Sequence, residues 1–497
     1  MAVIFTEGFD KYGGVNSNTS VVLTLLAAGE WTSAAGTHTI VAPLSATGQA
    51  YTLGTSSSLV KTLPTNYSRL IGGIRFNSPL AGGNAATLMQ FRDGATPQCS
   101  ITIEPTGIIN LRNGTVAGTI LASSAAVAAN STHYLEWDIT FGNSAAYQVW
   151  LDGVSAFSGT GDTTGTANNY ANGIAIAVGI TGSLTFDDLY LFDSTSSTNN
   201  AVLLTSPRIE TTFPASDSAV QFAFGAGILG SSVSKSSNVS QPAANGLFLR
   251  SYTPAASGTL NSISIVPAIT NGTINYRGVV YANSSGAPGS LMSSGTTVTG
   301  CTSGVPSILP LTTPQSLTAG TTYWIGFMVD TAVNTQLLDG GNNTTRWTAT
   351  FGSGAPNPPS GGTTTVANYL FWGNLTGIAA NYDEVNNNPP DGQYSYVYDS
   401  VVNHEDLYAF APLSSPPPGI VHCVAVKAYA QKSDSGTRTV SMRTKSGATD
   451  SAGSLAGQAL GTSFGWLASY FPTDPNSGAA WSATTLNAAT SGFKIDS

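Results

Sequence analysis

Charged residues are scarce in this sequence. Lys, Arg, Asp and Glu make up 9% of its 497 residues, against about 25% in an ordinary soluble domain. The 17 Lys and Arg residues are scattered, so they form no basic stripe of the kind that a nucleic-acid backbone requires. Because 41% of the residues are hydrophobic, the chain can still build cores. Nucleic acid is therefore not an expected partner.

Cysteines and long apolar runs are also few. Cys99, Cys301 and Cys423 are far apart and odd in number, which argues against a disulfide framework and against zinc, so we expect buried free thiols. The longest early apolar stretch, VVLTLLAAG at 21–29, is too short to span a bilayer, and no cationic segment marks it as a secretory signal. We expect a chain made in the cytoplasm, without membrane insertion.

Residues that favour α-helices are also few. Glu, Lys, Arg and Met are too few to build amphipathic helices, whereas short alternating runs such as QVWLDG and NYRGVVY recur between turn signals. The 55 Gly and 25 Pro suit many turns. The sequence therefore predicts an all-β chain of several antiparallel β-sandwiches, about three at the usual domain size of roughly 150 residues.

GAGILG, residues 225–230, fits the dinucleotide-binding pattern G-x-G-x-x-G. That fingerprint needs a helix after it and an acidic residue about 20 positions on. The continuation is rich in Ser and Asn, and no Asp or Glu occurs between Asp217 and Asp330. We interpret the match as a chance product of a glycine-rich β protein. The same lack of acids excludes a carboxylate glycosidase or a calcium cage built within that span.

GTSFG, residues 461–465, matches the nucleophile elbow G-x-S-x-G around Ser463. In hydrolases with this elbow the histidine follows the serine, whereas all four histidines here precede it, and WLASYF after it predicts a strand. We therefore do not expect Ser463 to be a nucleophile.

HYLEWDITFG, residues 133–142, alternates like a half-buried strand. Glu136 and Asp138 share one face, and the other face carries Leu135, Trp137, Ile139 and Phe141. The stretch resembles the E-x-D-x-x-E active-site strand of family 16 glycoside hydrolases, in which both glutamates act. Phe141 stands where the second glutamate is required. We expect the two acids to face solvent or to orient backbone, not to catalyse.

Residues 1–193 resemble a concanavalin A-like or laminin G-like jelly roll, carried by EPTGIIN, the Glu136 strand, WLDG and LTFDDLYLFD. The resemblance implies a lectin-like domain that binds glycans or protein on its concave face or rim loops, sometimes through Ca²⁺. Candidate calcium ligands are Asp93, Asp152 and Asp187, with Asp162 beside them. The alternative is that these aspartates bond turn backbone. No other cofactor is expected.

The opening MAVIFTEGFDKYG, combined with this sandwich, resembles virion structural proteins of tailed phages. After a linker at 193–200, LLTSPRIETTFPASDS resembles the start of a second virion sandwich, whose expected continuation NYDEVNNNPPDGQYSYVY comes only at 381–398. We therefore predict an insertion: a module at 225–372 placed in a loop of a domain made from 203–224 and 373–497.

The predicted inserted module resembles jelly-roll modules of bacterial surface proteins and secreted glycosidases, on stretches such as FLRSYTPAASGTLNSISI and TTYWIGFMVD. Three tryptophans, Trp324, Trp347 and Trp372, are candidates for stacking on a saccharide. The alternative is that they belong to the core, since an alternating strand sends one face inward.

These features predict a non-enzymatic virion structural protein (tail tip, baseplate, short fibre or decoration) that contacts host-surface polysaccharide. Its partners would be other virion proteins, in a homo-oligomer such as a trimer. The alternatives are a capsid decoration protein without a receptor role and a bacterial surface or secreted adhesin. A glycan-cleaving enzyme would need a carboxylate pair, which no spacing supports, among Glu7, Asp10, Glu136, Asp138, Glu384 and Asp391.

Overall fold

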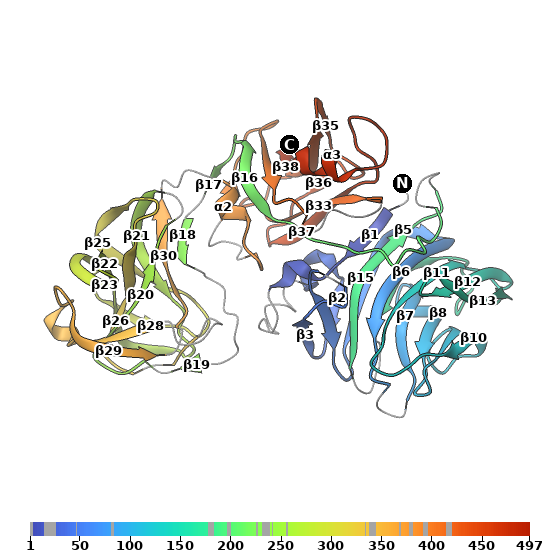
Figure 1. Cartoon of the computed structure of the whole chain (residues 1–497), viewed down its shortest axis with the longest axis horizontal. Helices are drawn as coiled ribbons and strands as arrows, with labels where there is room; N and C mark the ends of the chain where they lie inside the picture. Colours follow the sequence, from blue (N-terminus) through green and yellow to red (C-terminus); the bar gives the residue numbers. More distant parts are fainter. Residues whose placement is uncertain are drawn as a thin grey trace. The chain divides into compact units, whose positions relative to one another are not determined.

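The computed structural model describes residues 3–13, 26–45, 47–80, 84–176, 183–195, 200–224, 227–230, 239–240, 242–254, 257–332, 334–336, 344–366, 369–376, 381–390, 396–413 and 420–497. These residues form antiparallel sheets with a few short helices, so the all-β prediction is confirmed (Figure 1). The chain divides into two compact units: unit 1 is residues 1–220 with 400–497, and unit 2 is residues 221–399. No helix in the described part is long and apolar enough to cross a membrane.

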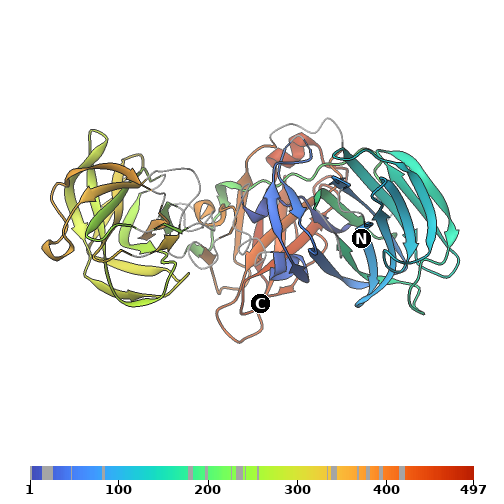
Figure 2. The same cartoon turned by 90° about the horizontal axis from the view of Figure 1, so that it is seen from below.

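Unit 1 begins with a sandwich of two sheets, seen as two layers of strands in Figure 1 and from below in Figure 2. Sheet A has the order β13-β12-β11-β6-β15-β4-β3, and β1 also pairs with β15. Its strands are β1 Val3–Glu7, β3 His38–Val41, β4 Ala50–Leu53, β6 Arg69–Asn77, β11 Thr132–Thr140, β12 Ala145–Leu151, β13 Val154–Gly161 and β15 Leu184–Phe192.

Sheet B has the order β10-β9-β8-β7-β14-β5-β2. Its strands are β2 Ser33–Ala35, β5 Ser58–Tyr67, β7 Ala86–Asp93, β8 Thr96–Ile103, β9 Ile108–Asn113, β10 Ile120–Ala126 and β14 Ala171–Ile176. Two short helices, η1 Asp10–Tyr12 and η2 Leu26–Glu30, accompany the sandwich.

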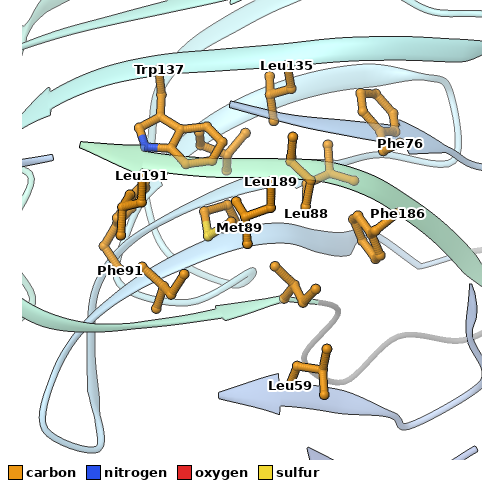
Figure 3. Close-up of a cluster of buried hydrophobic side chains, with 14 of the residues drawn as sticks. Leu59, Phe76, Leu88, Met89, Phe91, Leu135, Trp137, Phe186, Leu189 and Leu191 are labelled. Atoms are coloured by element: carbon orange, nitrogen blue, oxygen red, sulfur yellow. The ribbon is translucent and has the colours of Figure 1, made fainter. Parts of the chain in front are cut away.

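The core lies between sheets A and B (Figure 3). Trp137 on β11 is fully buried, and its ring meets that of Phe91 on β7 edge to face, 5.8 Å between centroids. Leu135, Ile139 and Phe141 are buried with it, so the predicted apolar face of this strand is confirmed. Alternation puts these side chains on one face because successive residues of a strand point to opposite sides.

The second part of unit 1 holds sheet C, in the order β16-β32-β38-β34-β35 with β36 beside β34, and the pair β33-β37. The bounds are β16 Pro214–Ala219, β32 Glu405–Phe410, β33 Val424–Ala430, β34 Thr439–Ser446, β35 Thr449–Ser451, β36 Gln458–Ala459, β37 Gly465–Phe471, α3 Ala483–Ala488 and β38 Thr490–Ile495. The strand predicted after GTSFG is β37.

Buried ion pairs join the two parts of unit 1. The Lys427 ammonium on β33 donates to the Thr6 carbonyl, 2.7 Å away, and pairs with Glu30. Lys11 forms an ion pair with Glu7 at 2.6 Å and lies 3.6 Å from Glu30, the partner of Lys427. Removing one partner of such a pair would leave an uncompensated buried charge, so these contacts fix the opening of the sequence against β33.

Unit 2 is a second sandwich. Sheet G has the order β23-β22-β26-β20-β28-β29 with β24 beside β22, sheet E has the order β18-β30-β21-β25, and their core lies between them. The bounds are β18 Gly227–Gly230, β20 Gly246–Tyr252, β21 Gly258–Ile265, β22 Asn271–Ser284, β23 Ala287–Ser294, β24 Val298–Cys301, β25 Ser307–Leu317, β26 Tyr323–Val329, β28 Thr344–Thr348, η3 Phe351–Ser353, β29 Ser360–Val366 and β30 Phe371–Thr376. The end of GAGILG is thus strand β18.

The chain enters and leaves unit 2 side by side. β17 Ala223–Phe224 pairs with β31 Val397–Tyr398, and β18 pairs with β30. The remaining short elements are the pair β19 Val239–Ser240 and β27 Thr335–Gln336, and helix α2 Tyr382–Val385. The structure divides the chain into two compact units. The predicted division into three domains, with an inserted module at 225–372, stays a prediction.

Candidate functional site

The acid pair Glu136 and Asp138 on β11 lies on the outer face of sheet A, the face turned away from the core. Glu136 is fully buried, and its Oε1 accepts hydrogen bonds from the Tyr190 hydroxyl (2.6 Å) and from the backbone N–H groups of Leu203 (2.9 Å) and Leu204 (3.0 Å). Asp138 accepts both hydrogen bonds of an Arg69 fork, at 2.7 and 2.5 Å. We expected this pair either to face solvent or to orient backbone, and Glu136 orients backbone.

The backbone that Glu136 binds belongs to residues 202–211, which we call the strap. Arg75 on β6 donates to the Ser206 and Pro207 carbonyls at 3.2 and 3.4 Å. The Ile209 N–H donates to Asp188 at 2.7 Å. The side chains of sheet A thus bind main-chain groups of the strap, and the strap covers the part of this face around Glu136.

Three aspartates lie under the strap and its neighbouring loops. Asp10 accepts from the Thr211 N–H at 3.1 Å, and burial raises its pKa to about 7. Burial, followed by repulsion from Asp188, raises the pKa of Asp187 to about 8. Burial also raises the pKa of Asp188, although Arg75 at 2.9 Å opposes the shift. Part of this cluster is therefore protonated near neutral pH.

The predicted calcium ligands are not brought together. No three His, Cys, Asp or Glu side chains that could share a metal ion occur among the residues that the structure describes. Each aspartate has separate partners: Asp93 accepts from Thr166 and Asn168, Asp152 from the Tyr134 N–H, Asp162 from the Thr164 N–H, and Asp187 from the Leu44 N–H. Calcium binding by this chain stays a prediction, but these four aspartates do not form one site.

The prediction for Trp372 is wrong. This residue on β30 is fully buried in a cluster with Val266 and Leu370, and its indole N–H donates to the Asn374 side chain at 3.0 Å. A ring with no exposed face cannot stack on a sugar. Its neighbour Phe371 belongs to the core between the sheets, so Trp372 points to the other face of sheet E and is buried there in a separate cluster.

Trp324 and Trp347 lie on one face of sheet G. On β26, Tyr323, Ile325 and Phe327 point into the core between the sheets, so Trp324 points outward. Across the sheet, Trp324 is opposite Ser251 of β20, and Trp347 of β28 is opposite Leu247 of β20. Both tryptophans are partly exposed and pack on the same outer cluster.

A polar group of side chains surrounds Trp324. Its indole N–H donates to the Asn283 side chain at 3.0 Å, which fixes the ring. Thr253 and Thr322 share a hydrogen bond of 2.8 Å between their hydroxyls, and Ser251 is exposed. We call Trp324, Asn283, Ser251, Thr253 and Thr322 the open patch. An indole face with amide and hydroxyl groups beside it suits the apolar ring and the hydroxyls of a sugar.

The middle of the same face is covered by residues 349–357. The Tyr281 hydroxyl donates to the Pro356 carbonyl at 2.9 Å, and the Leu291 N–H donates to the Asn357 side chain at 2.7 Å. Arg277 lies over the Phe351 ring, 5.0 Å from its centroid. Ala349 and Phe351 also pack with Leu247 and Leu249 of β20 and Met328 of β26, which are fully buried. The segment therefore closes the middle of the face, and Trp324 and Trp347 stay partly exposed.

Sequence reasoning missed the partners of Trp324 and the strap. Alternation in TTYWIGF places Thr322 and Trp324 on one face, and this signal was available. Asn283 and Ser251 come from other strands, so only the pairing of β22 and β20 with β26 reveals them. The strap lies up to 201 residues from its carboxylate partners in the chain, and nothing local marks it.

No protein-family model and no curated protein matches this chain. Among solved structures, it is similar to an endo-β-1,4-glucuronan lyase from the fungus Trichoderma reesei, with 15% identity over 33% of this chain and 91% of the other and a TM-score of 0.27. Domain 4 of an extracellular arabinanase from Geobacillus stearothermophilus, in complex with arabinotriose, has 18% identity over 39% and 93%, with a TM-score of 0.25. The receptor-binding domain of botulinum neurotoxin type G has 12% identity over 29% and 38%, with a TM-score of 0.22. Similarity at this level establishes neither a family nor an activity.

Proposed function

We propose that this chain is a non-enzymatic structural protein of a tailed-phage particle that contacts glycans on the host surface through the open patch. The observation that carries the glycan contact is the partly exposed Trp324 ring, held by Asn283 and flanked by hydroxyls of Ser251 and Thr322. Such a group on a strand is held rigidly, which limits the ordering that binding would otherwise require.

The carboxylates support the non-enzymatic part of the proposal. A glycosidase needs two acids that flank the scissile bond. Glu136 is bound to the strap, Asp138 to Arg69, Glu7 to Lys11 and Asp10 to backbone N–H groups, and Glu384 is buried. Asp391 lies outside the described residues.

The virion part is supported by the resemblance of the opening segment and the first sandwich to tailed-phage structural proteins. Its partners would be other virion proteins, and the particle its location. Two other functions fit the same fold: a capsid decoration protein without a receptor role, and a bacterial surface or secreted adhesin.

Labelling of purified particles tests the virion part. An antibody raised against residues 1–193 is applied to intact phage and viewed by electron microscopy. Label at the tail tip is the expected result, and label on the head would assign the chain to decoration. Particles without label, in preparations whose other structural proteins are labelled by their own antibodies, would refute the virion proposal and favour the adhesin.

A glycan array tests the contact itself. The full chain is applied to neutral and acidic bacterial polysaccharides, beside Trp324→Ala and the matched control Ile308→Ala. Ile308 is an exposed apolar residue on sheet E of the same unit. We expect binding that is lost in Trp324→Ala and kept in Ile308→Ala. Equal binding by both variants would contradict the assigned patch, and no binding to any polysaccharide would refute the glycan contact.

A further inference from the structure

Trp324 lies at the border of the covered part of sheet G. Its neighbour on β22 is Tyr281, which is fully buried and donates to the Pro356 carbonyl at 2.9 Å. Trp324 and Ala355 pack on the same buried cluster, one from the sheet and the other from the covering segment 349–357. A ligand on the Trp324 ring therefore meets this segment on one side.

The opposite side of Trp324 is open. Asn283, two residues beyond Tyr281 on the same face of β22, is exposed, and so is the hairpin turn at 285–286 that follows it. Ser251, the neighbour of Trp324 on β20, is exposed too. The open patch thus has one closed side, towards the covering segment, and one open side, towards the hairpin turn.

No side chain of the open patch is charged. Arg250, next to Ser251 in the chain, points to the other face of β20, where its guanidinium donates to the Tyr369 carbonyl at 3.0 Å. An uncharged sugar can lay its apolar face on the indole ring and bond its hydroxyls to the Asn283 amide and the Ser251 hydroxyl without losing the hydration of an ion. A charged sugar would lose part of that hydration and would find no opposite charge in the patch.

We infer that the open patch holds a single uncharged sugar at the end of a glycan chain. An internal sugar has neighbours on both sides, and one of them would have to pass over the covering segment 349–357. A terminal sugar has one neighbour, so the rest of the glycan leaves over the open side. This inference rests on the proposed glycan contact and adds the class of ligand and the part of the glycan that is bound.

The number of protein molecules bound per glycan chain tests this inference. The neutral polysaccharide that binds best on the array is cut into short, medium and long linear chains, and each is titrated calorimetrically with the protein. Each linear chain has one end of the kind that the patch holds. We therefore expect one protein per glycan chain at every length, and an affinity that changes by less than about threefold between lengths. Binding to internal sugars would instead place more protein on the longer chains.

Two variants complete the test. Trp324→Ala should lose binding at every length, whereas Trp347→Ala should bind every length like the unmodified protein, because Trp347 lies beyond the covered middle of the face.

Trp347 also packs on the cluster of Leu247 and Leu249, so its replacement by alanine can disturb the fold. Trp347→Phe keeps an aromatic ring in that cluster and is the control if the alanine variant melts at a lower temperature. Three results would overturn the inference while leaving the glycan contact standing: acidic ligands bind best on the array, the number of proteins per glycan chain rises with its length, or Trp347→Phe binds long chains more weakly at an unchanged melting temperature. No binding on the array would instead refute the glycan contact.

Discussion

At the scale of single residues, one side-chain type has opposite roles in the two units. Trp137 is fully buried between sheets A and B, where its ring meets Phe91, whereas Trp324 lies outside its sandwich with its N–H bound by Asn283. Both come from alternating strands. The difference is therefore made by the face of the strand on which each residue falls and by what covers that face.

Replacing Trp137 by alanine should destabilise unit 1 by about 3–5 kcal/mol, because a large buried ring is lost and a cavity remains. The matched change Trp324→Ala should cost much less, since its ring is already in contact with water. Chemical denaturation followed by circular dichroism measures both. Equal midpoints for the two variants would contradict the assigned burial.

Stability should also depend on pH through Asp10 and Asp187. Burial raises their pKa values to about 7 and about 8 from an ordinary value of 3.8. The folded state then binds more protons than the unfolded state, so the stabilisation is complete below the unfolded pKa and is lost as the pH rises through the folded values. We expect the free energy of unfolding of unit 1 to fall between about pH 4 and about pH 8.

Asp10→Asn isolates this effect, because an amide keeps the shape and does not titrate. The difference in unfolding free energy between Asp10→Asn and the unmodified chain should shift in favour of the variant as the pH rises. Guanidinium titrations at several pH values measure it. A difference that stays constant over this range would show that Asp10 is not protonated in the folded state.

At the scale of elements, the strap is held without strand pairing. Leu204 and Ser206 have φ values of 56° and 48°, in the left-handed region that such residues rarely adopt. The side chains of Glu136, Asp188 and Arg75 bind its main chain. The path of the strap thus depends on two acceptors, Glu136 and Asp188, and one donor, Arg75, that sheet A supplies.

Glu136→Ala should release the first part of the strap. The Leu204 N–H would lose its acceptor, at a cost of about 1–3 kcal/mol, and the Leu203 N–H would keep only the Tyr190 hydroxyl at 3.2 Å. Hydrogen exchange of both amides should quicken relative to amides of β11, most at Leu204. Glu136→Gln keeps an oxygen at the same place and should exchange more slowly than the alanine variant. Unchanged exchange at both amides in Glu136→Ala would show that other contacts hold the strap.

How far the sequence predicts these elements depends on the range of the contact. Alternation predicted β11 and its buried face. The same signal could have shown that Thr322 shares a face with Trp324, but it was not used. It could not tell that the outer face around Trp372 is covered, because alternation defines two faces without saying what lies on each. The hydrogen bonds from Leu203 and Leu204 to Glu136 join main-chain N–H groups to a side chain that is distant in the sequence. Because any residue except proline offers such an N–H group, the residue types at 203 and 204 do not predict these bonds.

At the scale of the whole molecule, unit 1 is built from both ends of the sequence. Its two chain segments, 1–220 and 400–497, are joined by the contacts of Lys427 with Thr6 and Glu30. The strands that lead into and out of unit 2, β17 and β31, are paired. A short bridge could therefore replace most of unit 2.

Deleting residues 226–371 and inserting a short Gly/Ser bridge should leave unit 1 folded. Its cores between sheets A and B and around Met442 contain no residue of the deleted segment. Thermal unfolding should show one cooperative transition, with near-ultraviolet circular dichroism retained below it. An aggregated product without a cooperative transition would refute the idea that the deleted segment is an inserted module.

The paired entry and exit strands have a consequence for the response of the molecule to proteolysis. A domain carried at the end of a chain is lost when a protease cuts its linker once. Unit 2 is connected to unit 1 by two chain segments, one after residue 220 and one before residue 400. Cleavage of one connecting segment leaves unit 2 attached through the other. A protease can therefore cut the chain once without releasing unit 2 and its partly exposed tryptophans.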